Sequence, residues 1–188
     1  MKLIKKISIK NLLILTLCLN TGSCASNEIE GVHPAFDDYV NDFEKILPKY
    51  SEDVRKLRIG FVDFPRVKDE AYTIGRCNLS ITLNHTVTID NTYWKGATPT
   101  GKYFTMLHEF GHCVCYMSHT EATSGLMGRL EEFLFKIGLW VKKGYLEDGC
   151  PASIMHPSDF GEVCAIRHFN YYIKEFKQSC EQRKSNVK

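Results

Sequence analysis

The segment His108-Glu109-Phe110-Gly111-His112 constrains this chain most, because its residue types at that spacing have a chemical use on a helix. Residues four apart on an α-helix lie on one face with about 5 to 6 Å between their β-carbons, so two imidazoles can converge on one metal ion. The carboxylate of Glu109 can reach a water molecule on that metal. A surface helix that merely carries two histidines is the simpler alternative.

Two histidines leave a catalytic zinc ion under-ligated, because such an ion takes three protein ligands and a water molecule. Our candidate for the third ligand is His119, seven residues after His112. Seven residues of unbroken helix rise about 10.5 Å, far more than a zinc to nitrogen bond of about 2 Å allows. We therefore predict that the helix ends between Cys113 and Ser118, although no Gly or Pro marks the break. An exposed His119 with no ligand role is the alternative.

A glutamate on a following helix offers a different third ligand, as in the thermolysin-like hydrolases. Glu132 lies 20 residues beyond His112, with Glu131 beside it, on an expected amphipathic helix at 126–139. Both acids fall next to the polar face of that helix, where a solvated charge pair needs no special explanation. We favour His119 and keep Glu132 as an alternative.

A methionine follows in Ser-Ile-Met-His-Pro at 153–157, after the turn-forming Asp-Gly-Cys-Pro at 148–151. Together with the earlier motif, this resembles the metzincin metalloproteases, whose HExxHxxGxxH zinc site precedes a tight turn with a methionine beneath the metal. The resemblance covers Phe104 to about Asp159 at the level of motifs. It implies that His108, His112 and His119 are the zinc ligands and that Glu109 is the general base. It also implies that Met155 forms the floor of the site without binding the metal.

The chain departs from the metzincin pattern in two places. The glycine of the family falls at Cys115 and its third histidine falls at Ser118, so His119 arrives one position late. Either the turn contains one extra residue here, or the true ligand lies elsewhere. Short exported bacterial metzincin-like proteins with His-Glu-x-Gly-His-Cys and a late histidine are similar, which favours the extra residue.

Hydrophobic patterning predicts strands early in the chain and helices late. Alternating or β-branched stretches predict strands at 57–64, 79–83 and 87–94, and helical spacing of apolar residues predicts helices at 33–49, from about 100, at 126–139 and at about 160–176. Without a repeat or linker, this indicates one α+β domain at 33–180 with a flexible tail at 181–188. The resemblance implies a small mixed twisted sheet with an active-site helix, a Met-turn and a C-terminal helix.

Residues 1–23 are typical of an export signal, because lysines precede an apolar stretch that is too short for a membrane span of about 20 residues. Thr-Gly-Ser-Cys at 21–24 also resembles a bacterial lipobox, which implies lipidation of Cys24, although Thr21 replaces the usual aliphatic residue. Simple secretion is the alternative. We expect an exported protein, either secreted or a lipoprotein of the periplasm or outer membrane, with 24–32 as a tether. Membrane contact is then expected only through the lipid.

Charge argues against a nucleic-acid partner. The leader holds four lysines and no acid, so the following 165 residues carry 20 basic and 22 acidic side chains and a formal charge of −2. A protein that binds the phosphate backbone normally has a basic surplus. We therefore expect a protein or peptide substrate and no nucleic acid.

Six cysteines remain when Cys18 and Cys24 are set aside, and an even number in an exported chain indicates disulfides. Sequence does not choose among their pairings, except that Cys113 and Cys115 lie two apart on an expected helix, where their side chains diverge. Cys77 follows Arg76 and is similar to the inhibitory thiol of some zinc proteases, but a disulfide explains it more simply.

The leading hypothesis from sequence is a Zn²⁺-dependent endopeptidase in which Glu109 activates water. The alternatives are a non-catalytic envelope lipoprotein with a structural zinc or none, and a thermolysin-like hydrolase that uses Glu132. The extended segment 87–94 is a candidate edge strand for a bound peptide, with a plain core strand as the alternative. His156 is expected near the cleft, and His168 is expected to pack or to face solvent on the last helix.

Overall fold

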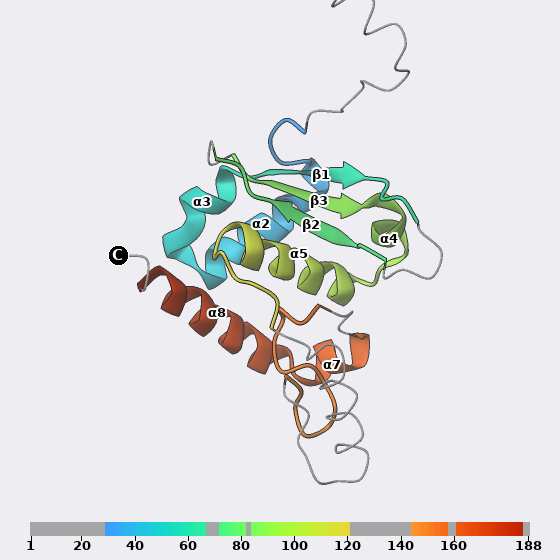
Figure 1. Ribbon diagram of the computed structural model, residues 1–188, viewed down its shortest axis with the longest axis vertical. Coiled ribbons are helices and arrows are strands. Elements are labelled where there is room, and N and C mark those ends of the chain that lie inside the picture. The colour runs from blue at the N-terminus through green and yellow to red at the C-terminus, as the bar shows by residue number, and fades with distance from the viewer. Residues whose placement is uncertain (1–28, 67–71, 82–83, 121–143, 158–160, 186–188) are drawn as a thin grey trace, which may run out of the picture.

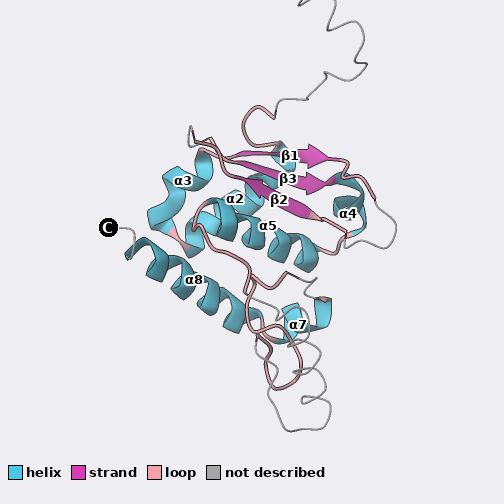
Figure 2. Ribbon diagram, viewed as in Figure 1, coloured by secondary structure: helices cyan, strands magenta, loops and turns pink. Residues whose placement is uncertain are grey.

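The computed structural model describes residues 29–66, 72–81, 84–120, 144–157 and 161–185, and Figures 1 and 2 show a small sheet with most helices packed below it. The elements in chain order are η1 (Pro34–Phe36), α2 (Asp37–Ile46), η2 (Pro48–Tyr50), α3 (Ser51–Arg55), β1 (Arg58–Val62), β2 (Gly75–Asn78), β3 (Thr86–Asp90), α4 (Asn91–Gly96), α5 (Pro99–Cys113), α7 (Glu162–Arg167) and α8 (Phe169–Ser185). This combination of helices with a small mixed sheet is the α+β class that the sequence predicted.

The three described strands form one sheet in the order β1-β3-β2. β1 runs parallel to β3 and β2 runs antiparallel to it, so Ile59 and Cys77 both lie opposite Val87. Val87 and Ile89 are fully buried and lie two apart, which is the spacing that places both side chains on the same face of a strand. That face packs toward α5, which lies below β2 and β3 in Figure 1.

Two sequence predictions about strands were wrong. Instead of 79–83, the chain pairs at Gly75–Asn78, and the apolar side chains of Leu79 and Ile81 are exposed in the loop that follows. Their hydrophobicity suggested a strand, whereas pairing with β3 decides where the strand lies. The segment 87–94 is not the candidate edge strand but the core strand that the sequence offered as the alternative, because β3 lies between the other two strands, and it ends at Asp90, where α4 begins. Within the described sheet, the edge strand beside α5 is β2.

Three aromatic side chains join α2, α5 and α8 beneath the sheet. The ring of Phe43 packs edge-on against Phe110 with 5.1 Å between centroids and against Phe176 with 6.1 Å, and all three side chains are fully buried. Full burial of one such side chain contributes about 1.5 to 3 kcal/mol relative to exposure. The contacts hold one face of α5 in the core and leave another face to line a cavity.

Both ends of the fold differ from expectation. Backbone hydrogen bonds join Gly31 and His33 to Ile59, so the last residues of the expected tether at 24–32 belong to the folded domain. The expected helix at 160–176 is two helices that meet at His168, and α8 continues to Ser185, so the expected flexible tail is wrong as far as that residue. Residues 181–185 are all polar, so they show no apolar periodicity from which a helix could be predicted. Residues 1–28, with the leader and Cys24, and the predicted helix at 126–139 lie outside the described residues.

Disulfides join all six cysteines that follow the expected leader, in the pairs Cys77–Cys113, Cys115–Cys180 and Cys150–Cys164. The expectation of disulfides is confirmed, as is the exclusion of a bond between Cys113 and Cys115. Within the described ranges, no helix is long and apolar enough to cross a membrane. The three disulfides are compatible with an exported protein.

Asp90 connects the end of β3 to the start of α4. Its carboxylate accepts hydrogen bonds from the backbone N–H of Tyr93 at 2.7 Å and of Phe64 at 3.1 Å, and the residue is 1% exposed. Burial raises the pKa of Asp90, but hydrogen bonds from the Tyr72 hydroxyl and from these two N–H groups outweigh burial and hold the pKa below its ordinary value of 3.8. The carboxylate therefore stabilises the folded state in its ionised form.

We predict that Asp90→Ala lowers the free energy of unfolding by about 1 to 2 kcal/mol at neutral pH, because the helix cap is lost. The folded pKa of Asp90 lies below the unfolded value, so its contribution is complete above about pH 4 and disappears as the pH falls through the folded pKa. Urea unfolding of wild type and variant at neutral and acid pH measures this difference. A gap that stays constant into acid would contradict the role of the ionised carboxylate.

Candidate metal centre

Helix α5 (Pro99–Cys113) carries the His-Glu-Phe-Gly-His segment in its C-terminal half. Its start is well determined, because the Thr98 hydroxyl accepts a hydrogen bond from the backbone N–H of Gly101 at 3.1 Å and Pro99 occupies the first turn. The helix ends at Cys113, within the predicted window between Cys113 and Ser118. The sequence therefore located the end of this helix from ligand geometry alone.

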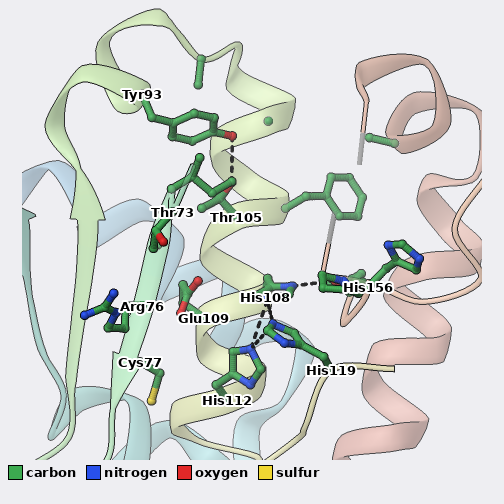
Figure 3. Close-up of a pocket in the computed structure, with 18 of the residues that line it drawn as sticks. Thr73, Arg76, Cys77, Tyr93, Thr105, His108, Glu109, His112, His119 and His156 are labelled. Atoms are coloured by element: carbon green, nitrogen blue, oxygen red, sulfur yellow. Dashed lines mark hydrogen bonds between the residues drawn. The ribbon is translucent and has the colours of Figure 1, made fainter. Parts of the chain in front are cut away.

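Three imidazoles converge beside α5, as Figure 3 shows. The Nε2 atoms of His108, His112 and His119 lie 3.1 Å from one another in every pairing. These three residues form a group that can hold a metal ion. The structure thus brings together the three histidines that the sequence singled out, including His119, whose spacing from His112 differs from the metzincin pattern by one residue.

The hydrogen bonds of the other ring nitrogens determine the tautomers of two of these histidines. The Nδ1 atom of His108 lies 2.8 Å from the carbonyl oxygen of Ile154, and that of His112 lies 2.6 Å from the carbonyl oxygen of Met117. A carbonyl oxygen only accepts, so each Nδ1 carries the hydrogen and donates it, and each Nε2 presents a lone pair. Carbonyl partners of this kind are typical of histidines that bind metals.

Electrostatics keep these rings neutral near pH 7. Burial lowers the pKa of His108 to about 4, against an opposing hydrogen bond to the Ile154 carbonyl, and burial also lowers the pKa values of His112 and His119. Neutral imidazole is the form that binds a metal.

The spacing of the three nitrogens fits a tetrahedral ion. Two ligands of such an ion at about 2.0 to 2.1 Å lie about 3.3 Å apart, close to the observed 3.1 Å. Without a cation, the lone pairs of His108 and His112 face each other at this distance, which is repulsive. The donor set therefore favours a bound metal, and three nitrogen donors suit zinc among other transition metals.

A second group of potential ligands, formed by Asp148, Cys150 and His168, is different in kind. Cys150 is bonded to Cys164, so it offers no thiolate. One carboxylate oxygen of Asp148 already accepts from Arg167 and from the ring nitrogen of His168, each at 2.8 Å. These bonds lower the pKa of Asp148 well below its ordinary range, the hydrogen bond from Arg167 having the largest effect. We interpret this group as a structural cluster. His168 is half-buried in it at the junction of α7 and α8, between the packing and the exposure that the sequence left open and not within the last helix.

The chain turns back after α5 without a glycine. Tyr116 has φ +54°, in the left-handed region that glycine usually occupies at the end of a helix. The backbone N–H of Met117 closes the turn on the carbonyl oxygen of Gly111 at 2.9 Å, and Arg183 donates to the carbonyl oxygen of Tyr116 at 2.8 Å. Disulfides at Cys113 and Cys115 anchor the chain just before the turn to β2 and to α8. These covalent and hydrogen bonds hold the backbone in the conformation that returns His119 to the other two histidines.

Glu109 lies between α5 and β2 and is 4% exposed (Figure 3). A β-carbon added at Gly75 would lie 2.5 Å from its Oε1 atom, so this glycine allows the carboxylate to approach the edge strand closely. Its Oε2 atom is buried without a hydrogen-bond partner among the described residues. Burial raises the pKa of Glu109 to about 8, opposed by the backbone N–H of Cys77 and the charge of Arg76.

Met155 packs beneath α5 and is fully buried. A β-carbon added at Gly111 would lie 2.5 Å from its sulfur atom, so the glycine inside the motif makes room for the methionine. Two carbonyls of the loop 153–155 support the histidines: that of Ile154 accepts from His108, and that of Met155 accepts from the backbone N–H of Thr120 at 3.0 Å. The loop that the sequence singled out for its methionine therefore contacts two ligand-bearing segments.

A cavity of about 830 Å³ opens beside the three histidines. It is lined by Glu109, by β2 residues including Gly75 and Cys77, and by His156. His156 lies at the cleft as predicted, although it is only 3% exposed and its ring packs against Tyr145 at 4.8 Å between centroids. The side chain of Cys77 is bonded to Cys113, which rules out an inhibitory thiol in this disulfide-bonded state.

Sequence analysis missed the backbone carbonyls of Met117 and Ile154, the close approach at Gly75 and the acidic side chain of Glu175 behind the loop 153–155. Carbonyl groups leave no signal in a sequence, and neither Gly75 nor Glu175 lies in a motif. The alternative ligands Glu131 and Glu132 lie outside the described residues.

No family model, curated protein or solved structure matches this chain.

We predict that removing the disulfide at the turn weakens metal binding specifically. The paired change Cys115→Ser with Cys180→Ser frees the segment that carries His119, so zinc affinity should fall about tenfold or more. The matched control is Cys150→Ser with Cys164→Ser, because that bridge joins no ligand-bearing segment. Either pair should cost about 2 to 4 kcal/mol of stability.

Competition with a chromophoric chelator, at a temperature where both variants are folded, measures the affinity. Equal affinities in the two paired variants would contradict a role of the Cys115–Cys180 bridge in placing His119.

Proposed function

We propose that this chain is a zinc-dependent endopeptidase with a metzincin-like fold, in which His108, His112 and His119 hold the metal. The observation that carries the proposal is that the three imidazole nitrogens and the Glu109 carboxylate line one cavity. Three nitrogen ligands beside an open cavity are typical of catalytic zinc sites, whereas structural zinc sites are closed by a fourth protein ligand. When bound, zinc lowers the pKa of water and polarises a carbonyl group.

Glu109 is the proposed general base. Its buried Oε2 atom has no hydrogen-bond partner among the described residues, and a bound metal ion in the same cavity would lower the pKa of this carboxyl and favour the ionised form that accepts a proton. In the proposed reaction Oε2 takes a proton from the attacking water, whose oxygen forms a bond to the peptide carbon, and returns the proton to the leaving amine as the C–N bond breaks. Gly75 sets how close the carboxylate lies to the strand on which we place the substrate.

β2 is the proposed substrate strand. It is the edge of the described sheet next to the site, and Gly75, Arg76 and Cys77 line the cavity. An extended peptide can pair with the backbone groups of such an edge, as in other strand-addition complexes. Binding through the main chain suits an internal stretch of polypeptide, which supports an endopeptidase. The sequence had suggested 87–94 for this role, and β2 takes its place.

We expect Glu109→Gln to lower kcat for an unfolded protein substrate or a quenched peptide by about 10² to 10⁴ while zinc stays bound, because only the proton acceptor is lost. The matched control is Glu52→Gln, an exposed acid on α3 that should leave turnover unchanged. Full activity of Glu109→Gln, or of wild type in excess chelator, would contradict the proposal.

Metal analysis of the same proteins separates the alternatives. Zinc without turnover, or no zinc in a folded sample, would favour the non-catalytic envelope lipoprotein. Zinc retained in His119→Ala but lost in Glu132→Ala would favour the thermolysin-like hydrolase. The position of His119 beside the other two histidines supports the first ligand set.

We also expect Gly75→Ala to displace the carboxylate of Glu109. The added β-carbon would lie 2.5 Å from Oε1, and the end of a flexible side chain moves more easily than the strand. Since displacement of a reacting group by about 1 Å can cost up to about 10² in rate, kcat should fall about tenfold or more with zinc affinity unchanged.

Gly96→Ala is the control for this change, because an added β-carbon there meets nothing within 4 Å. Steady-state kinetics and chelator competition on both variants test the idea. An unchanged kcat in Gly75→Ala would show that the position of the base does not depend on this glycine.

A further inference from the structure

Glu175 on α8 contacts the loop 153–155 and is partly buried there. Its Oε1 atom accepts hydrogen bonds from the hydroxyls of Ser153 at 2.9 Å and Ser179 at 3.1 Å. Burial raises the pKa of this carboxyl, opposed by the two hydroxyls and by the backbone N–H of Ile154, and its Oε2 atom is buried without a hydrogen-bond partner among the described residues. A buried carboxylate that receives two hydroxyl donors orients the groups that donate to it.

The hydroxyl of Ser153 extends this network by one residue. It donates to Glu175 and accepts from the backbone N–H of Met155 at 3.1 Å. The N–H of Met155 is therefore tied to the Glu175 carboxylate through the hydroxyl of Ser153. Because a peptide unit is planar, the N–H of Met155 and the carbonyl of Ile154 lie in one plane, so fixing the first restricts where the second points.

The carbonyls of the same loop bond to the metal-binding segments. The carbonyl oxygen of Ile154 accepts from Nδ1 of His108 at 2.8 Å, and that of Met155 accepts from the backbone N–H of Thr120, the residue after His119, at 3.0 Å. One three-residue loop thus contacts Glu175 through the hydroxyl of Ser153 and the ligand-bearing segments through its carbonyls.

We propose that Glu175 is a positioning residue for the metal centre, acting through the loop 153–155 on His108 and on the segment of His119. This inference rests on the proposed function in that it requires the three histidines to bind a metal. Outer partners of metal-binding histidines hold the ring in the orientation that directs its lone pair at the ion, and their loss typically costs about 10 to 100 in metal affinity. Glu175 does not contact His108 itself. It restrains the Ile154 carbonyl, and that carbonyl orients the ring of His108.

The test is the zinc affinity of the whole chain, measured by competition with a chromophoric chelator. Glu175→Ala removes the hydrogen bond to Ser153 and should weaken zinc binding by about tenfold, the low end of the range for a direct outer partner. Glu175→Gln keeps an oxygen acceptor without the charge and should give a smaller loss, which provides a second variant if the alanine form does not fold. Glu181→Ala, an exposed acid on the same helix, is the matched control and should bind zinc like wild type.

Two further measurements separate positioning from general destabilisation. The visible spectrum of the cobalt-loaded protein should change in Glu175→Ala and not in Glu181→Ala, because it reports ligand geometry. In addition, Ser153→Ala and Glu175→Ala should lower zinc affinity less together than the sum of their separate effects, because they interrupt one network.

Each negative result has a distinct meaning. Unchanged zinc affinity and an unchanged cobalt spectrum in Glu175→Ala, with tight binding by wild type, would overturn this inference and leave the proposed function standing. Folded wild type that binds no zinc would overturn both.

Discussion

The convergence of three imidazole nitrogens within 3.1 Å of one another is the constraint on which the rest of this structure depends. Two of these nitrogens present lone pairs to each other, because their rings donate from the opposite side to the carbonyls of Ile154 and Met117. Such an arrangement is unfavourable alone and favourable around a cation. This arrangement of the three nitrogens depends on where α5 ends, on the turn that follows and on the loop 153–155.

The turn after α5 shows how the chain manages without the glycine of the metzincin pattern. Tyr116 takes the left-handed conformation, which costs a non-glycine residue about 1 to 2 kcal/mol. Disulfides at Cys113 and Cys115 and the hydrogen bond from Arg183 hold it there. The strained position falls one residue after the glycine of that pattern, just as His119 falls one residue after its third histidine. Under the proposed function, one extra residue in this covalently anchored turn accounts for both departures from the pattern.

Local rules predicted much of this molecule. Helical periodicity located α2 and α5, ligand geometry located the end of α5, and cysteine spacing excluded a bond between Cys113 and Cys115. The predictions failed where partners distant in sequence decide. Leu79 and Ile81 looked like a strand, but pairing with β3 selected Gly75–Asn78, and the same pairing placed β3 inside the sheet. Likewise, the acid behind the metal centre belongs to α8, and no local pattern connects Glu175 to the loop 153–155.

X-ray absorption at the zinc edge of the zinc-loaded protein tests the central claim most directly, because it reports the atoms around the metal. The account predicts one zinc ion per chain with three imidazole nitrogens at about 2.0 to 2.1 Å and a remaining light-atom ligand from solvent. A site with fewer imidazoles, with sulfur, or with four protein ligands and no solvent position would contradict it.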